Sequence, residues 1–348
     1  MDYCIRICTT TAFTNGWMQQ MAERRPRIAI ATGDPSGIGP EISLKAALDP
    51  QVNGICRPIL VGDPDVLKRH AAAAGSAAMI TPVESVSNAR FTPGTVNVLA
   101  VPFSTEAPFA FGANGAPYGR ATIACARAAI RAALAGEVDA VVAAPTNQTS
   151  IAAAGITFDG YPSFVARETG MNEHDVFLML CFGDKRIVHT TLHLSVADAV
   201  ALMTRERVGR AIRAADAALR RLGVATPRIH VGGLNPHAGE GGLFGREEID
   251  IISPAIADAK AAGIDADGPF GADTMLHKSG IDAFVVMLHD QGHIPAKLLA
   301  PNRTAGLSIG SPILFSSVAH GSAFDIAGKG MANPAAMIEA IRRLSGAQ

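Results

Sequence analysis

The apolar positions of this chain fall into short runs that alternate with longer amphipathic segments. The short runs are rich in Val, Ile and Ala, which predicts buried strands. They lie at residues 27–32, 59–61, 138–144, 186–191, 228–232 and 283–288. Apolar residues at helical spacing predict helices, one from Pro40 and others at 118–135, 204–222, 247–262 and 334–344. Because strands that alternate with helices form parallel βαβ units, we expect an α/β protein with mostly parallel sheets.

The length of 348 residues fits two domains. We expect residues 22–150 and 300–348 to form a cofactor-binding α/β domain. Residues 151–299 are then a second domain for metal, substrate and dimerisation, with a cleft between the two. Residues 1–21 are expected to be a disordered N-terminal extension, because they lack the apolar core of a signal peptide and Met21 precedes the first predicted strand.

Composition excludes several classes of protein. Lys and Arg number 30 against 31 Asp and Glu, without a basic stripe, so we expect no nucleic-acid partner. No apolar run approaches the roughly 18 residues of a membrane span, so no membrane association is expected. The five cysteines are scattered, which argues against a disulfide scaffold and favours a reducing, cytoplasmic location.

Two histidines, His193 and His289, are expected at the ends of predicted strands, and His237 follows a third strand. Ligands of open parallel sheets bind outside the carboxyl ends of the strands, so these imidazoles could share one metal ion with open positions for substrate. Such an ion stabilises negative charge that develops on a substrate oxygen. Zinc is the expected metal, although cobalt, manganese and nickel also accept imidazole. The alternative is that each histidine only forms hydrogen bonds at a strand end.

A lysine and two carboxylates lie near these histidines in the sequence or in similar loops. Lys297 follows His289 by eight residues and either pairs with a substrate carboxylate, donates a proton, or is an ordinary surface lysine. Asp273 and Asp290 are candidate catalytic residues or orient a metal ligand, and the alternative for each is a turn-former. His293 is close enough to His289 to support it.

The stretch HGSAFDIAGKGMANP, residues 320–334, has the small residues that let a backbone approach a flat ligand closely. Asp325 could accept hydrogen bonds from ribose hydroxyls, and its charge would repel a 2′-phosphate, which favours NAD over NADP. The candidate cofactor contacts are His320, Gly321, Ala323, Asp325 and Asn333. The alternative is an ordinary glycine-rich loop before the last helix.

Five motifs occur in the order found in the 4-hydroxythreonine-4-phosphate dehydrogenase family: GDPSGIGPE, GLNPHAGEGGLFGREE, GPFGADT, HDQGHIPAK and HGSAFDIAGKG. This resemblance implies an isopropylmalate dehydrogenase-like fold of two α/β/α domains with an interdomain cleft. It also implies NAD, a divalent metal on His193, His237 and His289, and a substrate-binding Lys297. The family further implies a homodimer with a shared active site, to which the partner chain contributes one metal ligand.

The chain departs from the phosphate-binding members at three places. Those members carry Gly-His-Thr-Glu where this chain has Gly-Tyr-Pro-Ser at 160–163, and an Arg-Thr-Ser stretch where it has Phe-Ser-Ser at 315–317. At the position of a substrate-contacting Asn in those members, this chain has Gly306. Loss of a bidentate arginine and two polar contacts removes much of a phosphate site.

The segments GYPS, GMNEHDVFLML, RIVHTTLH and LSIG resemble instead the terephthalate cis-dihydrodiol dehydrogenase branch. Its members oxidise a cyclic cis-dihydrodiol dicarboxylate to a β-keto acid, which decarboxylates to a catechol. Tyr161 and Phe315 suit a flat carbocycle, and Ser163 and Lys297 could meet its carboxylates. The sequence therefore predicts a NAD-dependent, metal-assisted dehydrogenase of aromatic catabolism. The alternatives are a 4-hydroxythreonine-4-phosphate dehydrogenase of pyridoxal phosphate biosynthesis and a phosphate acyltransferase-like enzyme.

Overall fold

The computed structural model describes residues 25–106, 108–300, 304–318 and 320–346, so the predicted extension at 1–21 lies outside it. One sheet of twelve strands runs through the described chain in the order β3-β4-β2-β1-β5-β12-β11-β6-β7-β10-β8-β9. Neighbouring strands are parallel except where β11 pairs with β12 and β6, and where β6 pairs with β7. The predicted α/β class with a mostly parallel sheet is therefore confirmed.

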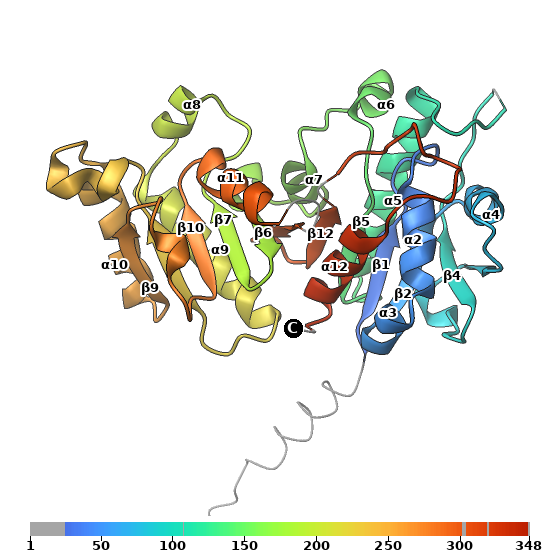
Figure 1. The fold of residues 1–348 in the computed structure, drawn as a ribbon, viewed down its shortest axis with the longest axis horizontal. Helices are drawn as coiled ribbons and strands as arrows, with labels where there is room; N and C mark the ends of the chain where they lie inside the picture. The colour runs from blue at the N-terminus through green and yellow to red at the C-terminus, as the bar shows by residue number, and fades with distance from the viewer. Residues whose placement is uncertain (1–24, 107, 301–303, 319, 347–348) are drawn as a thin grey trace, which may run out of the picture.

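The first lobe, residues 25–168 with 304–346, lies on the right in Figure 1. Its strands are β1 (Arg27–Ala31), β2 (Arg57–Gly62), β3 (Met79–Val83), β4 (Thr95–Ala100), β5 (Ala140–Ala143), β11 (Ala305–Ile309) and β12 (Phe315–Val318). Its helices are α2 (Gly39–Leu48), α3 (Pro50–Ile55), α4 (Pro64–Ala73), α5 (Ala116–Leu134), α6 (Gln148–Ala153), α7 (Tyr161–Glu168) and α12 (Ala335–Leu344).

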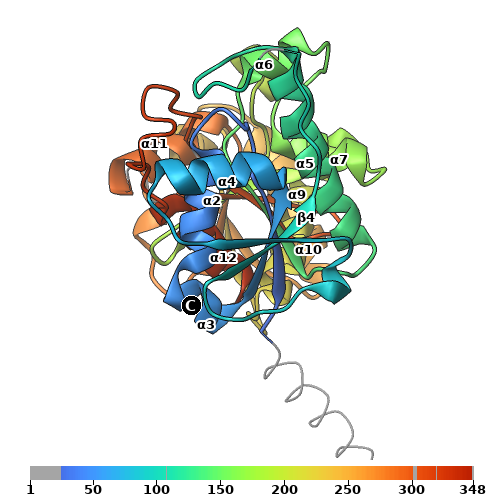
Figure 2. The same cartoon turned by 90° about the vertical axis from the view of Figure 1, so that its right-hand side faces the viewer.

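Side chains alternate across β1, which explains why helices cover both faces of the first lobe. Ile28 and Ile30 pack with residues of α2 and α12, whereas Ala29 and Ala31 pack with residues of α5. Figure 2 shows α5 on one side of the sheet and α2 and α12 on the other. The second, smaller core also holds Phe164 of α7, so this part of residues 151–299 packs in the first lobe.

The second lobe, residues 173–300, lies on the left in Figure 1. Its strands are β6 (Phe177–Phe182), β7 (Lys185–His189), β8 (Arg228–Gly232), β9 (Asp265–Phe270) and β10 (Ala283–Val286). Its helices are α8 (Val196–Ala201), α9 (Arg205–Arg221), α10 (Ser253–Ala261) and α11 (His289–Leu299). Helices α9 and α10 pack in the larger core, and α11 packs on the opposite face. Because one sheet joins the lobes, the division into two domains stays a prediction.

Two of the predicted strand ends are wrong in detail. The strand expected at 186–191 ends at His189, so His193 lies in the following loop. His289 begins helix α11 instead of ending a strand. The side chain of Gln291 accepts hydrogen bonds from the backbone of Met287 and Leu288, at 2.9 and 3.0 Å, and so caps this helix start. None of the helices in the described segments is long and apolar enough to cross a membrane.

Candidate active site

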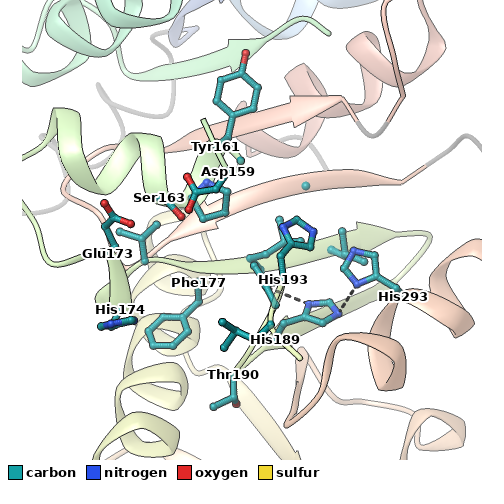
Figure 3. A pocket seen from close by; sticks show the side chains of 18 of the residues that line it. Asp159, Tyr161, Ser163, Glu173, His174, Phe177, His189, Thr190, His193 and His293 are labelled. Atoms are coloured by element: carbon teal, nitrogen blue, oxygen red, sulfur yellow. Dashed lines mark hydrogen bonds between the residues drawn. The ribbon is translucent and has the colours of Figure 1, made fainter. Parts of the chain in front are cut away.

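A cavity of about 360 Å³ lies between the two lobes, at the carboxyl ends of the parallel strands (Figure 3). The first lobe contributes residues from α7, β11 and β12, and the second lobe contributes residues from β7, α9 and α11. The polar lining includes Asp159, Tyr161, Ser163, Thr190, Arg207 and Ser317, with the four histidines His174, His189, His193 and His293. This is the edge of the sheet at which open α/β folds bind their ligands.

Four histidines form a cluster in the second lobe, and three of them, His189, His193 and His293, line the cavity. The rings of His289 and His293 stack with centroids 3.8 Å apart and planes within 9°. These two residues are one helical turn apart on α11, which places them on the same face. The ring of His193 lies 5.7 Å from that of His289, and His189 lies 4.6 Å from His293. Two of the predicted metal ligands, His193 and His289, are therefore adjacent.

Hydrogen bonds to carbonyl groups assign the protons of this cluster, because a carbonyl oxygen only accepts. His189 Nδ1 donates to Leu178 O at 3.3 Å, so its Nε2 is unprotonated when the ring is neutral. His293 Nδ1 lies 3.1 Å from that Nε2 and 3.2 Å from His289 O, and it donates to both. His289 Nδ1 donates to Asp290 Oδ1 at 2.7 Å. The Nε2 atoms of His289 and His293 are therefore left with free lone pairs.

Burial keeps the inner histidines neutral. Burial first, and the neighbouring His293 second, lower the pKa of His189 to about 3. Burial and the adjacent His289 lower the pKa of His293 to about 4. Gly292 allows the rings to approach, because a Cβ at this position would lie 2.2 Å from His189 Nε2. At neutral pH His189 and His293 are thus neutral imidazoles, which is the form that binds metal.

His237 does not join this cluster within one chain. It lies in the loop Pro236–Gly242 after β8, with a φ of 53°, and contacts Glu240 Oε2 at 3.3 Å and the ring of Phe244. Its side chain is 65% exposed. In the described segments, no three His, Cys, Asp or Glu side chains gather closely enough to hold a metal ion. The predicted triad is therefore incomplete in a single copy, and the role of His237 stays a prediction.

The structure places the three other catalytic candidates differently. Asp290 contacts His289 and is in position to orient it. Lys297 is exposed on the same face of α11 as His289 and His293, since all three are spaced by four residues. Asp273 lies in the loop after the edge strand β9, and no contact brings it to the described histidine cluster.

Two of the predicted substrate residues from the first lobe, Tyr161 and Ser163, line the cavity, and one does not. The Tyr161 hydroxyl donates to Ala144 O at 3.4 Å, and burial raises its pKa. Phe315 is 1% exposed, and its ring packs against Tyr161 with centroids 5.0 Å apart. Phe315 can therefore influence a substrate only through Tyr161, because its ring is in the core of β12.

The candidate cofactor loop at 320–334 is anchored on α2. Ile38 N donates to Ser322 O at 2.9 Å, and Ala332 N donates to Glu41 Oε1 at 2.8 Å. Lys45 Nζ bonds Glu41 and also donates to the carbonyl groups of residues 330 and 332. These bonds fix the backbone of a segment that has no helix or strand of its own.

Within this loop Asp325 and Gly321 are exposed, and His320 is partly buried. Ala323 adopts a φ of 41°, which is uncommon for a residue other than glycine. Asn333 Oδ1 accepts from Ala335 N at 2.9 Å, so it has a local role at the start of α12. The exposed Asp325 is free to meet a ligand, and the cofactor contacts stay predictions.

Sequence reasoning missed two residues that line the cavity, His189 and Arg207. His189 is not among the predicted site residues, and its four-residue spacing from His193 after a strand is the signal that could have found it. Arg207 is one of many arginines in α9, and only the packing of α9 against β6 shows that it is buried. Nothing in the sequence distinguishes it from its exposed neighbours.

A mostly parallel sheet with a histidine-lined cavity at its carboxyl edge defines an α/β enzyme. The particular family follows from a match over residues 54–344 to the family described as pyridoxal phosphate biosynthetic protein PdxA. The chain belongs to this family.

Three relatives narrow the comparison. The 1,2-dihydroxy-3,5-cyclohexadiene-1,4-dicarboxylate dehydrogenase of a Comamonas species is 44% identical over 92% of this chain and 98% of its own. A crystal structure of a terephthalate 1,2-cis-dihydrodiol dehydrogenase from Burkholderia xenovorans LB400 is 46% identical, covers 93% and 98% of the two chains, and has a TM-score of 0.73.

A crystal structure of a 4-hydroxythreonine-4-phosphate dehydrogenase from Burkholderia phymatum is 35% identical, with coverage of 92% and 98% and a TM-score of 0.84. The family and its dehydrogenase members make this chain an oxidoreductase that acts on a CH–OH group. The predicted resemblance, to the family and to the dihydrodiol branch among its neighbours, is confirmed.

Proposed function

We propose that this enzyme uses NAD and a divalent metal to oxidise a cyclic cis-dihydrodiol dicarboxylate, whose β-keto acid product loses CO₂ to give a catechol. The observation that carries this proposal is the position of the three departures from the phosphate-binding members. Residues 160–163, Gly306 and Ser317 all line the one cavity beside the histidines. The substitutions therefore gather where a substrate would bind.

The changed positions suit a flat carboxylate better than a phosphate. Gly306 and Ser317 are paired in the register of β11 and β12, so the missing Asn and the altered arginine stretch face the same space. Tyr161 supplies an aromatic ring there. A phosphate dianion needs several charged or polar donors, and the removal of a bidentate arginine leaves fewer of them.

The histidines fit a divalent cation. Asp290 holds the Nδ1 proton of His289, which directs the Nε2 lone pair outward, and this carboxylate–histidine arrangement is common in metal sites. We propose His193 and His289 as two ligands and His237 from a second copy as the third, with zinc as the metal. When bound, the metal stabilises negative charge on the substrate oxygen, and NAD accepts the hydride.

The residues of the chain position the substrate for this reaction. As the C–H bond at the hydroxyl carbon breaks, the hydroxyl proton leaves and a ketone forms beside the ring carboxylate. The C–C bond to that carboxylate then breaks, CO₂ departs, and its electron pair enters the ring, which becomes aromatic. Lys297 meets a substrate carboxylate, and the Asp325 carboxylate accepts hydrogen bonds from the ribose of NAD.

Exposed apolar side chains support a homodimer. Nine large apolar side chains of the second lobe are exposed, and they occur in the segments 194–200, 243–249 and 294–299. Leu298 is 75% exposed and Leu243 is 73% exposed. Exposed apolar surface of this kind marks interaction sites. A second copy that covers this surface would also bring its His237 loop toward the histidine cluster of the first copy. We further propose that the dimer is cytoplasmic.

The alternative is a 4-hydroxythreonine-4-phosphate dehydrogenase, which the Burkholderia phymatum relative favours. The third hypothesis, a phosphate acyltransferase, loses its support because the named relatives are dehydrogenases. A direct assay separates the first two: purified enzyme, NAD and metal are supplied with either the dihydrodiol dicarboxylate or 4-hydroxythreonine 4-phosphate. We expect NADH and CO₂ from the dihydrodiol. Turnover of the phosphorylated substrate alone would overturn the proposal.

A further inference from the structure

Arg207 is a buried cation at the edge of the cavity. The residue is 9% exposed and lines the cavity from α9. Its Nε donates to Thr190 O at 2.8 Å and its Nη1 to His174 O at 3.4 Å, while its Cζ lies 5.6 Å from the centre of the Phe177 ring. Figure 3 shows Thr190, Phe177 and His174 on the side of the cavity away from Tyr161.

Arg207 forms no ion pair within the described part of the chain, in contrast to its neighbours on α9. Arg205 pairs with Asp258, and Arg210 pairs with Asp175 at 2.6 Å. Asp175 is therefore paired with Arg210 and forms no ion pair with Arg207. Charged side chains are seldom buried without a partner, because their desolvation is costly. This arginine consequently has positive charge and hydrogen-bond donors to offer to a ligand.

The remaining donors of Arg207 suit a carboxylate. A guanidinium has five N–H groups, and main-chain carbonyls accept from one on Nε and one on Nη1. The donors left on Nη1 and Nη2 form the flat edge that pairs with a carboxylate.

We propose that Arg207 binds the carboxylate that remains on the substrate ring after CO₂ is lost, so that the enzyme selects dicarboxylates over monocarboxylates. This assignment rests on the proposed function. A rigid ring with carboxylates at opposite ends needs an anchor at each end. Thr190, which Arg207 contacts, precedes His193 by three residues, so the Cα atoms of Thr190 and His193 lie no more than about 11 Å apart.

The test compares two substrates in four proteins. We assay four proteins: the wild type, Arg207→Met, Arg207→Lys and the control Arg205→Met. Each is supplied with the dihydrodiol dicarboxylate or with an analogue that lacks the carboxylate retained in the product and keeps the one lost as CO₂. For Arg207→Met we expect the KM of the dicarboxylate to rise by roughly tenfold to a hundredfold, with little change for the analogue. Arg207→Lys should recover part of the loss, and Arg205→Met should behave as the wild type.

A measurement on the wild type covers the case in which the variants do not fold. Terephthalate should inhibit at a concentration at least about tenfold lower than benzoate, because only terephthalate has the second carboxylate. Equal inhibition would overturn the assignment of Arg207, as would equal KM changes for both substrates in Arg207→Met. A wild type that oxidises neither dihydrodiol would instead count against the proposed function.

Discussion

The two lobes of this enzyme differ in how their candidate sites are held and in how their exposed apolar side chains are distributed. In the first lobe, Glu41 and Lys45 hold the loop at 320–334, and His70 donates from Nε2 to Pro35 O at 2.9 Å. In the second lobe, His193 and His289 lie together without a third ligand in the described chain. The loop at 320–334 is thus held by contacts within one copy, whereas the histidine cluster has no third metal ligand there.

The exposed apolar side chains follow the same division. In the described part of the first lobe they are four separate residues, Met79, Phe111, Leu134 and Met331. In the second lobe they gather in three segments, two of which include or border α8 and α11, and Figure 1 shows these helices on the same side of the lobe. This difference fits the proposed homodimer, in which a second copy would cover the apolar segments of the second lobe.

The largest loss of activity is expected when a proposed metal-binding histidine of the second lobe is replaced. His289→Ala should lose bound metal and reduce kcat by at least about a thousandfold, because metal stabilisation of the substrate oxygen is worth several kcal/mol. Atomic absorption and NADH formation measure the two effects. The exposed His277→Ala is the matched control, and a His289→Ala enzyme with full activity would refute the metal site.

The next effect tests the exposed apolar surface. Leu298→Glu should convert the dimer to a monomer and lower activity at least about tenfold, since a shared site needs both copies. Light scattering gives the mass. Leu134→Glu changes a leucine of the first lobe that is 46% exposed and should leave the mass unchanged. A Leu298→Glu protein that remains dimeric would show that this surface has another use.

A smaller effect is expected at the cofactor loop. Asp325→Asn should raise the KM for NAD by about tenfold, because a charged acceptor for the ribose hydroxyls is lost, and should affect NADP less. Glu84→Gln, an exposed carboxylate of the same lobe, serves as the control. If Asp325→Asn keeps the wild-type preference between the two cofactors, Asp325 does not read the ribose.

The smallest effect concerns the stability of the first lobe. Burial lowers the pKa of His70 below its usual 6.5, so the folded protein disfavours the charged ring. The contribution of neutral His70 to the free energy of unfolding is complete above pH 6.5. It declines as the pH falls from 6.5 toward the pKa of His70 in the folded protein, by at most about 1.4 kcal/mol per pH unit. Urea unfolding should show a steeper loss of stability in the wild type than in His70→Gln, because His189 and His293 contribute equally to both proteins. Parallel curves would contradict it.

The regular parts of the fold could be predicted from the sequence because their signals are local. The apolar run at 27–32 matches β1, and the spacing at 204–222 matches α9 with Thr204 as its cap. The strand β6, with the sequence FLMLCF, was missed because an apolar run of this length has no periodicity that separates strand from helix. Its antiparallel pairing with β11 depends on contacts between distant segments.

The candidate site could be predicted only where a motif carried it. His193 and His289 came from strand positions and family resemblance, and the structure brings them together. The start of α11 at His289 could have been found from Gln291 three residues after Leu288, which is a capping pattern. The burial of Arg207 could not be found, because it depends on how α9 packs against Thr190 and Phe177.

The central claim is that one metal site takes His193 and His289 from one copy and His237 from another. The direct test mixes the inactive variants His237→Ala and His289→Ala, unfolds and refolds them together, and measures metal content and activity. Mixed dimers contain one complete site each, so we predict recovery of about a quarter of the wild-type activity. No recovery from properly formed mixed dimers, or full metal binding by His237→Ala alone, would contradict the account.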